Sequence, residues 1–307
     1  MPPVLLTGAT GFIGQHLQSE LLNEQMGVLA VVRPSSRHKK ALAEGVEAVY
    51  CDLSDTAQLV AAIERCSAVI HCAGSVRGRS LEDFRPANIA GVRAVVDAMN
   101  QVKTRIPMLL VSSLAAARPH VSDYANSKFL GERELIEHAG FPWTIIRPPA
   151  VYGPGDKEML PILKLARKGL VTPAGPRDQK LSLVHVKDVA AAVVACLKNF
   201  GACDGKTFTL DDGHEGGYDW EEIAQACSTG RRFRLNVPGW LLFGSGYVNL
   251  ALSRILGYVP MLTPGKAREL TQADWVCNNR DLNQATGWSP EIDLQQGVQS
   301  LFERSGD

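Results

Sequence analysis

The stretch Thr7-Gly8-Ala9-Thr10-Gly11-Phe12-Ile13-Gly14 lies between a short apolar run, Val4–Thr7, and a helix-period segment, Ile13–Asn23. Its three glycines allow a tight turn, close approach of the backbone to a pyrophosphate and close packing of helix on strand, while the helix dipole favours negative charge. The spacing is Gly-x-x-Gly-x-x-Gly, whereas the common dinucleotide fingerprint is Gly-x-Gly-x-x-Gly. We predict a dinucleotide-binding loop formed by Gly8, Thr10, Gly11, Phe12, Ile13 and Gly14; the alternative is a glycine-rich turn without a ligand.

Apolar runs and helix-period segments alternate through the first two-thirds of the chain. The predicted strands are Val4–Thr7, Val28–Val32, Val46–Tyr50, Ala68–His71, Met108–Val111, Trp143–Arg147 and Ser182–Val186. The predicted helices include Ile13–Asn23, Ala57–Glu64, Ile89–Met99, Ser122–His138 and Val189–Leu197. This alternation predicts an α/β fold, a doubly wound parallel sheet of the Rossmann type with helices on both faces.

Proline and glycine interrupt this pattern after Tyr152, and a second irregular region follows Leu210. We expect these segments to form a smaller substrate-binding lobe over the carboxyl edge of the sheet. Residues 1–154 and 180–211 are assigned to the nucleotide-binding Rossmann domain, and residues 155–179 and 212–307 to the lobe.

The chain has 307 residues, and its 32 acidic and 32 basic side chains balance to a formal net charge of zero. Without a basic excess, nucleic acid is not an expected partner. The seven cysteines are scattered without a Cys-x-x-Cys pair, so we expect neither a metal site nor a disulfide framework. No export signal is visible at the amino terminus, and we expect a cytoplasmic protein.

The segment Val237–Leu262 is strongly apolar, but polar residues and glycines such as Gly246, Asn249 and Arg254 interrupt it before it reaches membrane-spanning length. We therefore expect no integral membrane segment. A buried or pocket-lining helix is the favoured interpretation, and contact with a membrane surface is the alternative.

The residues after the second predicted strand, Arg33-Pro34-Ser35-Ser36-Arg37, contain no acid. An acid here would bond a free ribose 2′-hydroxyl, whereas a base suits a 2′-phosphate. Arg33 and Arg37 therefore favour NADP over NAD as the cofactor. Asp52 and Leu53, just after the third strand, are placed to meet the adenine; capping the following helix is the other role open to Asp52.

Tyr124 and Lys128 lie four residues apart at the beginning of a predicted helix, and this spacing puts them on one face. Free tyrosine has a pKa of about 10, so it is a poor base unless nearby positive charge favours the phenolate. The Lys128 ammonium, with an oxidised nicotinamide, would supply that charge and let Tyr124 transfer a proton as hydride moves. Ser113, at the end of the fifth strand, can hold the substrate oxygen. A purely structural tyrosine–lysine pair is the alternative.

With these motifs in place, the chain resembles an extended-type short-chain dehydrogenase/reductase of the NAD-dependent epimerase/dehydratase group. The resemblance runs from the glycine loop to about Ala190. Besides the loop and the residues Ser113, Tyr124 and Lys128, it rests on Asp52-Leu53, on His71-Cys72-Ala73-Gly74, on the segment from Arg147-Pro148 to Asp156, and on the segment from His185 to Ala190.

The resemblance implies that Ala73 and Gly74 pass beside the cofactor, that Lys128 binds the nicotinamide ribose and that Pro148 lies near the nicotinamide amide. Asn88, His185 and Asp188 are expected to stabilise the fold, with Asp188 as a helix cap.

Three departures from the family pattern narrow the reaction. Members acting on nucleotide sugars usually carry an arginine four residues before the histidine that matches His185, and here that residue is Leu181. The Thr-Asp-Glu triplet of the dehydratases is replaced by Ser113-Leu114-Ala115, and only ten residues separate Ser113 from Tyr124. Together with the apolar stretch Trp240–Leu256, these departures resemble the dihydroflavonol-reductase and hydroxysteroid-dehydrogenase branch, with a rather hydrophobic pocket.

We therefore expect an NAD(P)-dependent oxidoreductase that interconverts a ketone and a secondary alcohol on a small, rather apolar substrate. A sugar or nucleotide-sugar epimerase of the same family is one alternative. A non-catalytic dinucleotide-binding redox sensor or assembly subunit is the other. Members of the family often form homodimers, so a homodimer is among the expected states.

Overall fold

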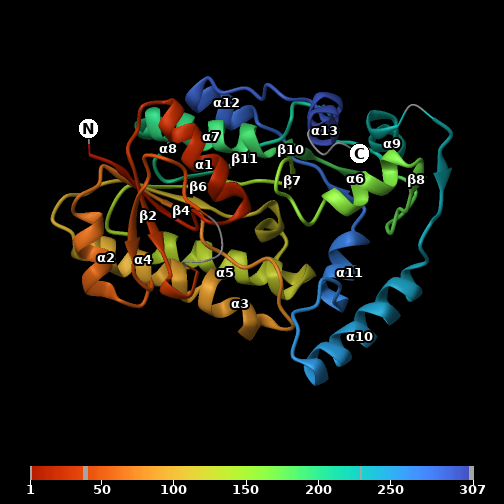
Figure 1. The fold of residues 1–307 in the computed structure, drawn as a ribbon, viewed down its shortest axis with the longest axis horizontal. Helices are drawn as coiled ribbons and strands as arrows, with labels where there is room; N and C mark the ends of the chain where they lie inside the picture. Colours follow the sequence, from red (N-terminus) through yellow and green to blue (C-terminus); the bar gives the residue numbers. More distant parts are fainter. Residues whose placement is uncertain (1, 37–40, 229, 304–307) are drawn as a thin grey trace.

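The protein was analysed as a computed structural model that describes residues 2–36, 41–228 and 230–303. Seven parallel strands form the main sheet in the order β11-β6-β5-β4-β1-β2-β3 (Figure 1). Their bounds are β1 Val4–Thr7, β2 Val28–Val32, β3 Glu47–Tyr50, β4 Ala68–His71, β5 Met108–Val111, β6 Trp143–Arg147 and β11 Lys206–Thr209. The order reverses at β1, next to β4, and such a reversal is where ligands bind in open α/β sheets.

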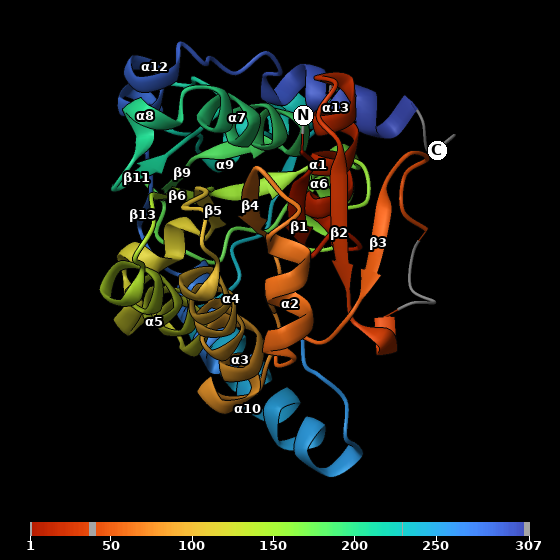
Figure 2. The same cartoon turned by 90° about the vertical axis from the view of Figure 1, so that its left-hand side faces the viewer.

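Helices cover both faces of this sheet. One layer holds α1 (Phe12–Asn23), α7 (Val186–Lys198), α8 (Phe200–Cys203) and α12 (Arg280–Thr286), and the other holds α2 (Thr56–Ile63), α3 (Leu81–Asn88), α4 (Ala90–Gln101) and α5 (Asp123–His138). Figure 2 shows the sheet between the two layers. The predicted doubly wound Rossmann architecture is confirmed.

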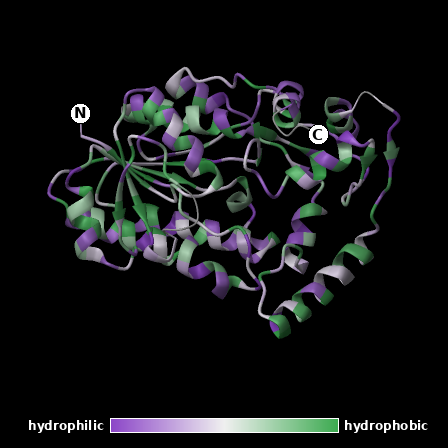
Figure 3. Cartoon of the chain, viewed as in Figure 1, coloured by the Kyte–Doolittle hydropathy of each residue, from purple (hydrophilic) through white to green (hydrophobic). Residues whose placement is uncertain are grey.

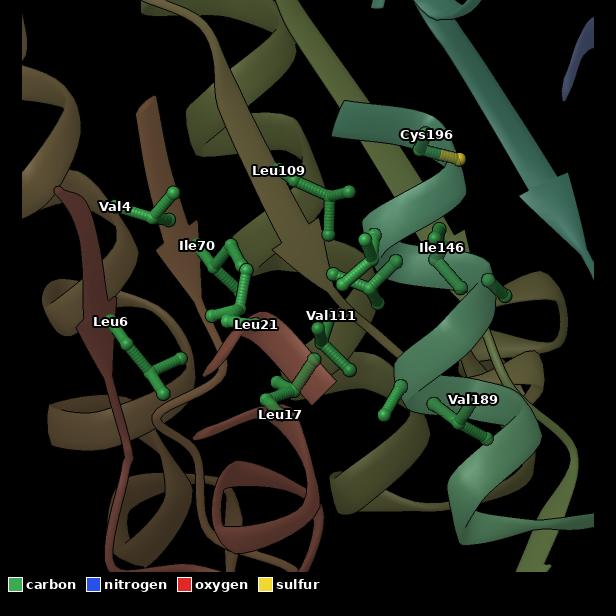
Figure 4. Close-up of a cluster of buried hydrophobic side chains, with 14 of the residues drawn as sticks. Val4, Leu6, Leu17, Leu21, Ile70, Leu109, Val111, Ile146, Val189 and Cys196 are labelled. Carbon is green, nitrogen blue, oxygen red and sulfur yellow. The ribbon is translucent and has the colours of Figure 1, made fainter. Parts of the chain in front are cut away.

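Apolar cores fill both spaces between sheet and helices, because adjacent residues of a strand point to opposite faces. Leu6 of β1 belongs to the core with α1 and α7, whereas Leu5 belongs to the core with α2 and α4. Figure 4 shows the first core, in which Leu17 of α1 and Val189 of α7 lie with Ile70 of β4. The two cores hold the carboxyl ends of the strands, and thus the site, in place.

The assignment of Ser182–Val186 to the main sheet is wrong. That segment forms β10 (Leu183–His185), which pairs with β7 (Ala150–Tyr152) in a separate two-stranded sheet. The seventh strand of the main sheet is β11, whose Lys206 and Thr207 are exposed and whose Phe208 is buried. An edge strand buries little, so its sequence carries a weak apolar signal.

A third, smaller core lies beyond the sheet's carboxyl edge. Its helices are α6 (Leu160–Arg167), α9 (Trp220–Cys227) and α13 (Leu294–Glu303), and its short strand pairs are β8 (Leu170–Val171) with β12 (Phe233–Arg234) and β9 (Lys180–Leu181) with β13 (Asp274–Trp275). This core also includes Tyr152 and Leu183. The two segments 155–179 and 212–303 thus contribute most residues of this core. The boundaries between the Rossmann domain and the lobe stay a prediction.

The apolar segment Val237–Leu262 contains helix α10 (Gly239–Leu256), followed by α11 (Pro264–Leu270). The helix was expected to be buried or to line a pocket; it is not buried, because only Gly246 and Ser253 of α10 are buried, but its residues Tyr247, Leu250 and Arg254 line a cavity. Figures 1 and 3 show α10 projecting from the body of the molecule, with α11 between them. Within the described ranges, no helix has the length and apolarity needed to cross a bilayer.

Candidate active site

The glycine loop lies at the carboxyl end of β1, where two of its glycines are required by geometry. Gly8 has a φ of +74°, and a Cβ there would lie 2.6 Å from the amide nitrogen of Ala73. A Cβ on Gly14 would overlap the carbonyl oxygen of Gly8. Gly11 is the N-cap of α1 and makes no side-chain hydrogen bond to the first amides of this helix. These amides, with Thr10, Phe12 and Ile13, belong to the predicted phosphate loop.

The end of β4 is joined to this loop by a buried hydrogen-bond chain. The amide of Ala73 donates to Thr7 Oγ1 (3.3 Å), and the Thr7 hydroxyl lies 2.9 Å from His71 Nδ1. Burial lowers the pKa of His71 to about 3, so the ring is neutral and shares one proton with the Thr7 hydroxyl across this contact. This chain fixes Ala73 and Gly74 directly above the glycine loop.

Lys128 reaches across to the same strand ends. Its Nζ donates to the carbonyl oxygen of Val111 (3.3 Å), and a Cβ on Gly74 would lie 3.1 Å from that Nζ and 3.1 Å from Asn88 Oδ1. Burial lowers the pKa of the Lys128 ammonium from its ordinary value. Asn88 accepts from the Ser75 amide and donates to the Ser75 carbonyl and the Ser127 hydroxyl, so it ties the loop after β4 to α5.

Tyr124 and Ser113 meet at the end of β5. Ser113 accepts a hydrogen bond from the Ala115 amide (3.2 Å) at the start of the short helix Leu114–Ala117, which places its hydroxyl beside the phenol. Burial raises the pKa of Tyr124, and a hydrogen bond with Ser113 counteracts part of this rise. The sequence predicted that nearby positive charge would lower the pKa of Tyr124. In the chain without a cofactor this pKa is raised instead, because desolvation of the phenolate outweighs the nearby positive charge.

The sequence did not single out the charged groups that face Tyr124 from the lobe. Lys266 lowers the pKa of the phenol and Glu269 and Glu158 raise it. Lys266 Nζ lies 2.9 Å from Glu269 Oε2, and the Ser122 hydroxyl donates to the other oxygen of Glu269. The sequence around Lys266 shows only that a helix begins at Thr263-Pro264. It gives no indication that this helix contacts Tyr124, about 140 positions earlier in the chain.

A cavity of about 300 Å³ opens beside Tyr124. Its walls come from the loop after β4, the start of α5, and the segment from α10 to α11. The lining includes Phe84, Leu250 and Met261, but also the cations Arg77, Arg79, Arg254, Lys266 and Arg268 and the acids Asp123 and Glu269. Of the apolar residues of α10, Tyr247 and Leu250 line this cavity. The cavity therefore combines apolar and charged groups, because α10 turns most of its other apolar side chains outward.

Arg77 and Arg79, in the loop after β4, each form an ion pair at the cavity. Arg77 lies 2.7 Å from Glu158, and Arg79 lies 2.9 Å from Asp83, while both guanidinium groups line the cavity. These ion pairs hold the two cations at the rim beside Tyr124.

At the other end of the cleft, Arg33 directly follows β2 and is exposed. The pKa of Asp52 is lowered, mainly by two hydrogen bonds that Ser54 donates to it and to a smaller extent by the charge of Arg33. Asp52 does not cap the next helix: the cap of α2 is Asp55, which accepts from the Gln58 amide. Leu53 follows Asp52 and packs against the core with α2 and α4, and Arg37 lies outside the described residues.

Three further family positions have structural contacts. Pro148 is buried, and its carbonyl accepts from the Leu114 amide (2.8 Å), just beyond Ser113. His185 caps α7. Asp188 was expected as a helix cap, but it accepts instead from the amides of Glu291 and Ile292 (3.1 Å each) and so holds the carboxyl-terminal segment.

The cleft between these groups fits a dinucleotide. Gly8 and Gly14 leave room where a Cβ would collide with backbone, α1 presents uncapped amides, and Gly74 leaves the Lys128 ammonium accessible. In the described part of the chain, the buried hydroxyl of Ser112 has no hydrogen-bond partner, nor does His71 Nε2. Within the same residues, no group of histidine, cysteine, aspartate and glutamate side chains forms a metal site.

Comparison with known proteins places these features in a family. The model of the NAD dependent epimerase/dehydratase family matches residues 4–209. The chain is 35% identical over 279 residues to ceramide reductase of Caulobacter vibrioides (strain NA1000 / CB15N). The alignment covers 89% of this chain and 85% of that protein. It is 26% identical over 239 residues to UDP-glucose 4-epimerase of Vibrio cholerae, with 69% and 71% covered.

Among solved structures, MoeE5 in complex with UDP-glucuronic acid and NAD superposes with a TM-score of 0.74 at 19% identity, over 99% of both chains. At this identity the likeness concerns the fold. Together with the family match and the ceramide reductase similarity, it leads to one conclusion: the chain belongs to the NAD-dependent epimerase/dehydratase family and is an NAD-dependent enzyme of the extended short-chain dehydrogenase/reductase type.

Proposed function

We propose that this protein is an NAD(P)-dependent oxidoreductase that interconverts a ketone and a secondary alcohol, with Tyr124 as the general acid and base. The observation that carries the proposal is the meeting of the Tyr124 and Ser113 hydroxyls beside a cavity of about 300 Å³, one helical turn from Lys128. A proton donor beside a nicotinamide-binding cleft is what carbonyl reduction requires.

Each residue of the site is assigned a separate role in the reduction. A bound reduced nicotinamide supplies the hydride to the carbonyl carbon. Tyr124 donates its phenolic proton to the substrate oxygen, and Ser113 donates a hydrogen bond to that oxygen as negative charge develops. Because burial raises the pKa of Tyr124, the phenol is protonated at neutral pH and ready to act as the acid. Lys128 is assigned to the ribose of the nicotinamide, and Ala73, Gly74 and Pro148 to the walls beside it.

For the cofactor we propose a preference for NADP over NAD. Arg33 follows β2 directly, is exposed and acts electrostatically on Asp52, which lies at the neighbouring strand end. A guanidinium at this place suits a ribose 2′-phosphate. Arg37 is proposed as a second contact, and Asp52 and Leu53 as the contacts to the adenine.

For the substrate we propose an amphiphile with a ketone near its polar end and a long apolar part. The cavity combines cations such as Arg77 and Lys266 with apolar groups such as Leu250 and Met261. The relative at 35% identity is named ceramide reductase, and ceramides are amphiphiles with long apolar chains.

The test is a turnover assay with purified protein. Oxidation of NADPH and of NADH is followed with long-chain and short-chain ketones, using wild type and Tyr124→Phe. We expect steady nicotinamide oxidation with a long-chain ketone, and at least a 100-fold lower rate for Tyr124→Phe, about the effect of losing general acid catalysis. Cofactor binding, measured by nicotinamide fluorescence, should change little because the phenol contributes little to it.

Two results would favour the alternatives. Interconversion of sugar epimers without net oxidation of the cofactor would identify an epimerase. Cofactor binding without turnover of any ketone or sugar would identify a sensor or assembly subunit. An active Tyr124→Phe variant would contradict the assignment of the acid.

A further inference from the structure

Helix α10 exposes an apolar face that no described part of the chain covers. Trp240 and Ile255 are 76% and 79% exposed, and Val248 and Leu256 are 60% and 69% exposed. A surface helix of a globular protein normally turns such side chains to the core and charges to water. The 18 residues of α10 extend over about 27 Å, so the exposed apolar face is long. Figure 3 shows its largely hydrophobic colouring.

The exposed arc of α10 carries no ionisable side chain except at its edge. At 100° per residue, Trp240, Val248, Leu252 and Ile255 share the outward half of the helix, and all four are exposed. The opposite side packs near Thr263-Pro264 through Gly246. Two hydroxyls lie on the arc: Ser245 donates to backbone carbonyls of its own helix, and Tyr247, which is 61% exposed, lies at the edge of the arc where it lines the cavity. Arg254 is also at the rim of the cavity.

The segment that leads into this helix is cationic. Between Ser228 and Arg268 the sequence contains no aspartate or glutamate, although acids and bases balance over the whole chain. Arg231, Arg232 and Arg234 precede α10 and are exposed, as are the apolar Phe233 and Leu235 between and beside them. Arg232 lies 3.3 Å from Glu221, so Arg231 and Arg234 are the cations assigned to the surface, whereas Arg254, Lys266 and Arg268 line the cavity.

We propose that α10 and the preceding segment 231–238 form a docking surface for an anionic lipid bilayer. An apolar helical face with aromatic residues and adjacent arginines is suited to lie at the boundary between headgroups and acyl chains. A second copy fits less well, because a twofold contact through this face would bring the same acid-free, cationic segment against itself.

The docking surface adjoins the cavity. Leu250 and Arg254 of α10 line the cavity, together with Met261, which is 45% exposed. A chain partly drawn from the bilayer could thus enter between α10 and the loop after β4 without crossing water. This link to substrate entry rests on the proposed function, whereas docking itself does not.

The docking test uses the full-length protein and vesicles of phosphatidylcholine with or without phosphatidylglycerol. We expect co-sedimentation with the anionic vesicles, weakened by salt because charged contacts contribute. Trp240 is the most exposed tryptophan, whereas Trp220 and Trp288 are each 7% exposed. Binding should therefore shift tryptophan emission to the blue, and Trp240→Phe should remove this shift while retaining co-sedimentation.

Variants separate the apolar and the charged contributions. Trp240→Asp/Ile255→Asp should abolish co-sedimentation, and Arg231→Gln/Arg234→Gln should weaken it about fivefold per arginine. Leu165→Asp on α6 is the matched control, since Leu165 is 39% exposed and lies on another surface. Circular dichroism and thermal melts establish that each variant is folded.

The outcomes are distinct. Failure of the wild type to bind anionic vesicles, or equal loss for Leu165→Asp, would overturn the proposal. So would a wild-type dimer in sedimentation velocity that Trp240→Asp/Ile255→Asp converts to a monomer. Because vesicle binding is measured without substrate, it is independent of catalysis. A water-soluble short-chain ketone should be reduced equally by wild type and the Trp240→Asp/Ile255→Asp variant, so an inactive wild type would count against the proposed function alone.

Discussion

At the scale of residues, the electrostatic environment of Tyr124 comes from three parts of the chain. Ser113 approaches from the end of β5, Glu158 acts from the segment between β7 and α6, and Lys266 and Glu269 act from α11. The ion pair between Lys266 and Glu269 limits the net field on the phenol, because the two charges have opposite effects. The chain by itself therefore keeps the phenol protonated, which suits reduction.

Replacing Lys266 tests this balance. Lys266→Met removes the cation that lowers the pKa of Tyr124, so that pKa should rise further. The pH profile of kcat for alcohol oxidation, which needs the phenolate, should move to higher pH. Lys180→Met is the control, since Lys180 is paired with Glu222 in the lobe. Identical profiles for Lys266→Met and wild type would show that Lys266 does not act on the proton transfer.

The proposed preference for NADP can also be tested at a single residue. Arg33→Ala should raise the KM for NADPH about tenfold, the effect of losing one charge-assisted hydrogen bond. The KM for NADH should stay within about twofold, because NADH carries no 2′-phosphate. Steady-state kinetics with both cofactors provide the measurement. An equal effect on both would remove the reason for preferring NADP.

At the scale of elements, α5 carries Tyr124 and Lys128 and is fixed to the sheet by a buried ion pair. Arg147 of β6 makes a bidentate contact with Glu132 (2.9 and 2.5 Å), whose side chain is only 1% exposed. At the other end of the helix, Ser122 caps α5 through the Ala125 amide and contacts Glu269 of α11. These contacts hold α5 against both the sheet and the lobe.

Breaking the buried pair should destabilise the protein. Glu132→Gln leaves the Arg147 charge without its partner, and the free energy of unfolding should fall by about 3 kcal/mol. Denaturant unfolding provides the measurement. Asp97→Asn, which breaks an exposed pair with Arg93 on α4, is the control and should have little effect. A Glu132→Gln variant as stable as that control would mean that packing alone holds α5.

At the scale of the whole molecule, buried titratable groups link folding to pH. Burial lowers the pKa of His185 to about 4, below its ordinary value, and raises the pKa of Asp211 to about 6. Between pH 6.5 and 4 the unfolded chain binds a proton at His185 that the folded protein does not, so the free energy of unfolding falls as pH falls. Asp211 acts in the opposite direction, because its folded form takes up the proton first.

His185→Asn should therefore reduce acid destabilisation. Asparagine retains the ability to cap α7 but does not titrate. The difference in unfolding free energy between wild type and variant should change by up to about 1.4 kcal/mol per pH unit below pH 6.5. Thermal or urea unfolding at several pH values measures it. The exposed His120→Asn is the control, and a pH-independent difference for His185→Asn would contradict the prediction.

Elements whose sequence pattern arises from local burial could be predicted, and the others could not. Strand and helix positions around the glycine loop were predicted from periodicity because burial on both sides of a parallel sheet imposes continuous apolar strands. β11 escaped prediction, since an edge strand with Lys206 and Thr207 exposed leaves little pattern. For the same reason β10, which is apolar, was assigned to the wrong sheet.

The sequence by itself therefore determined the Rossmann architecture and the family, because turn geometry and strand periodicity are local properties. It also put Tyr124 and Lys128 on one helical face. Only the tertiary structure decided that Lys266 and Glu269 face Tyr124, that Asp188 holds the carboxyl-terminal segment, and that α10 turns its apolar side outward. The physical reason is that an apolar segment specifies burial against something, and its sequence does not say whether that partner belongs to the same chain.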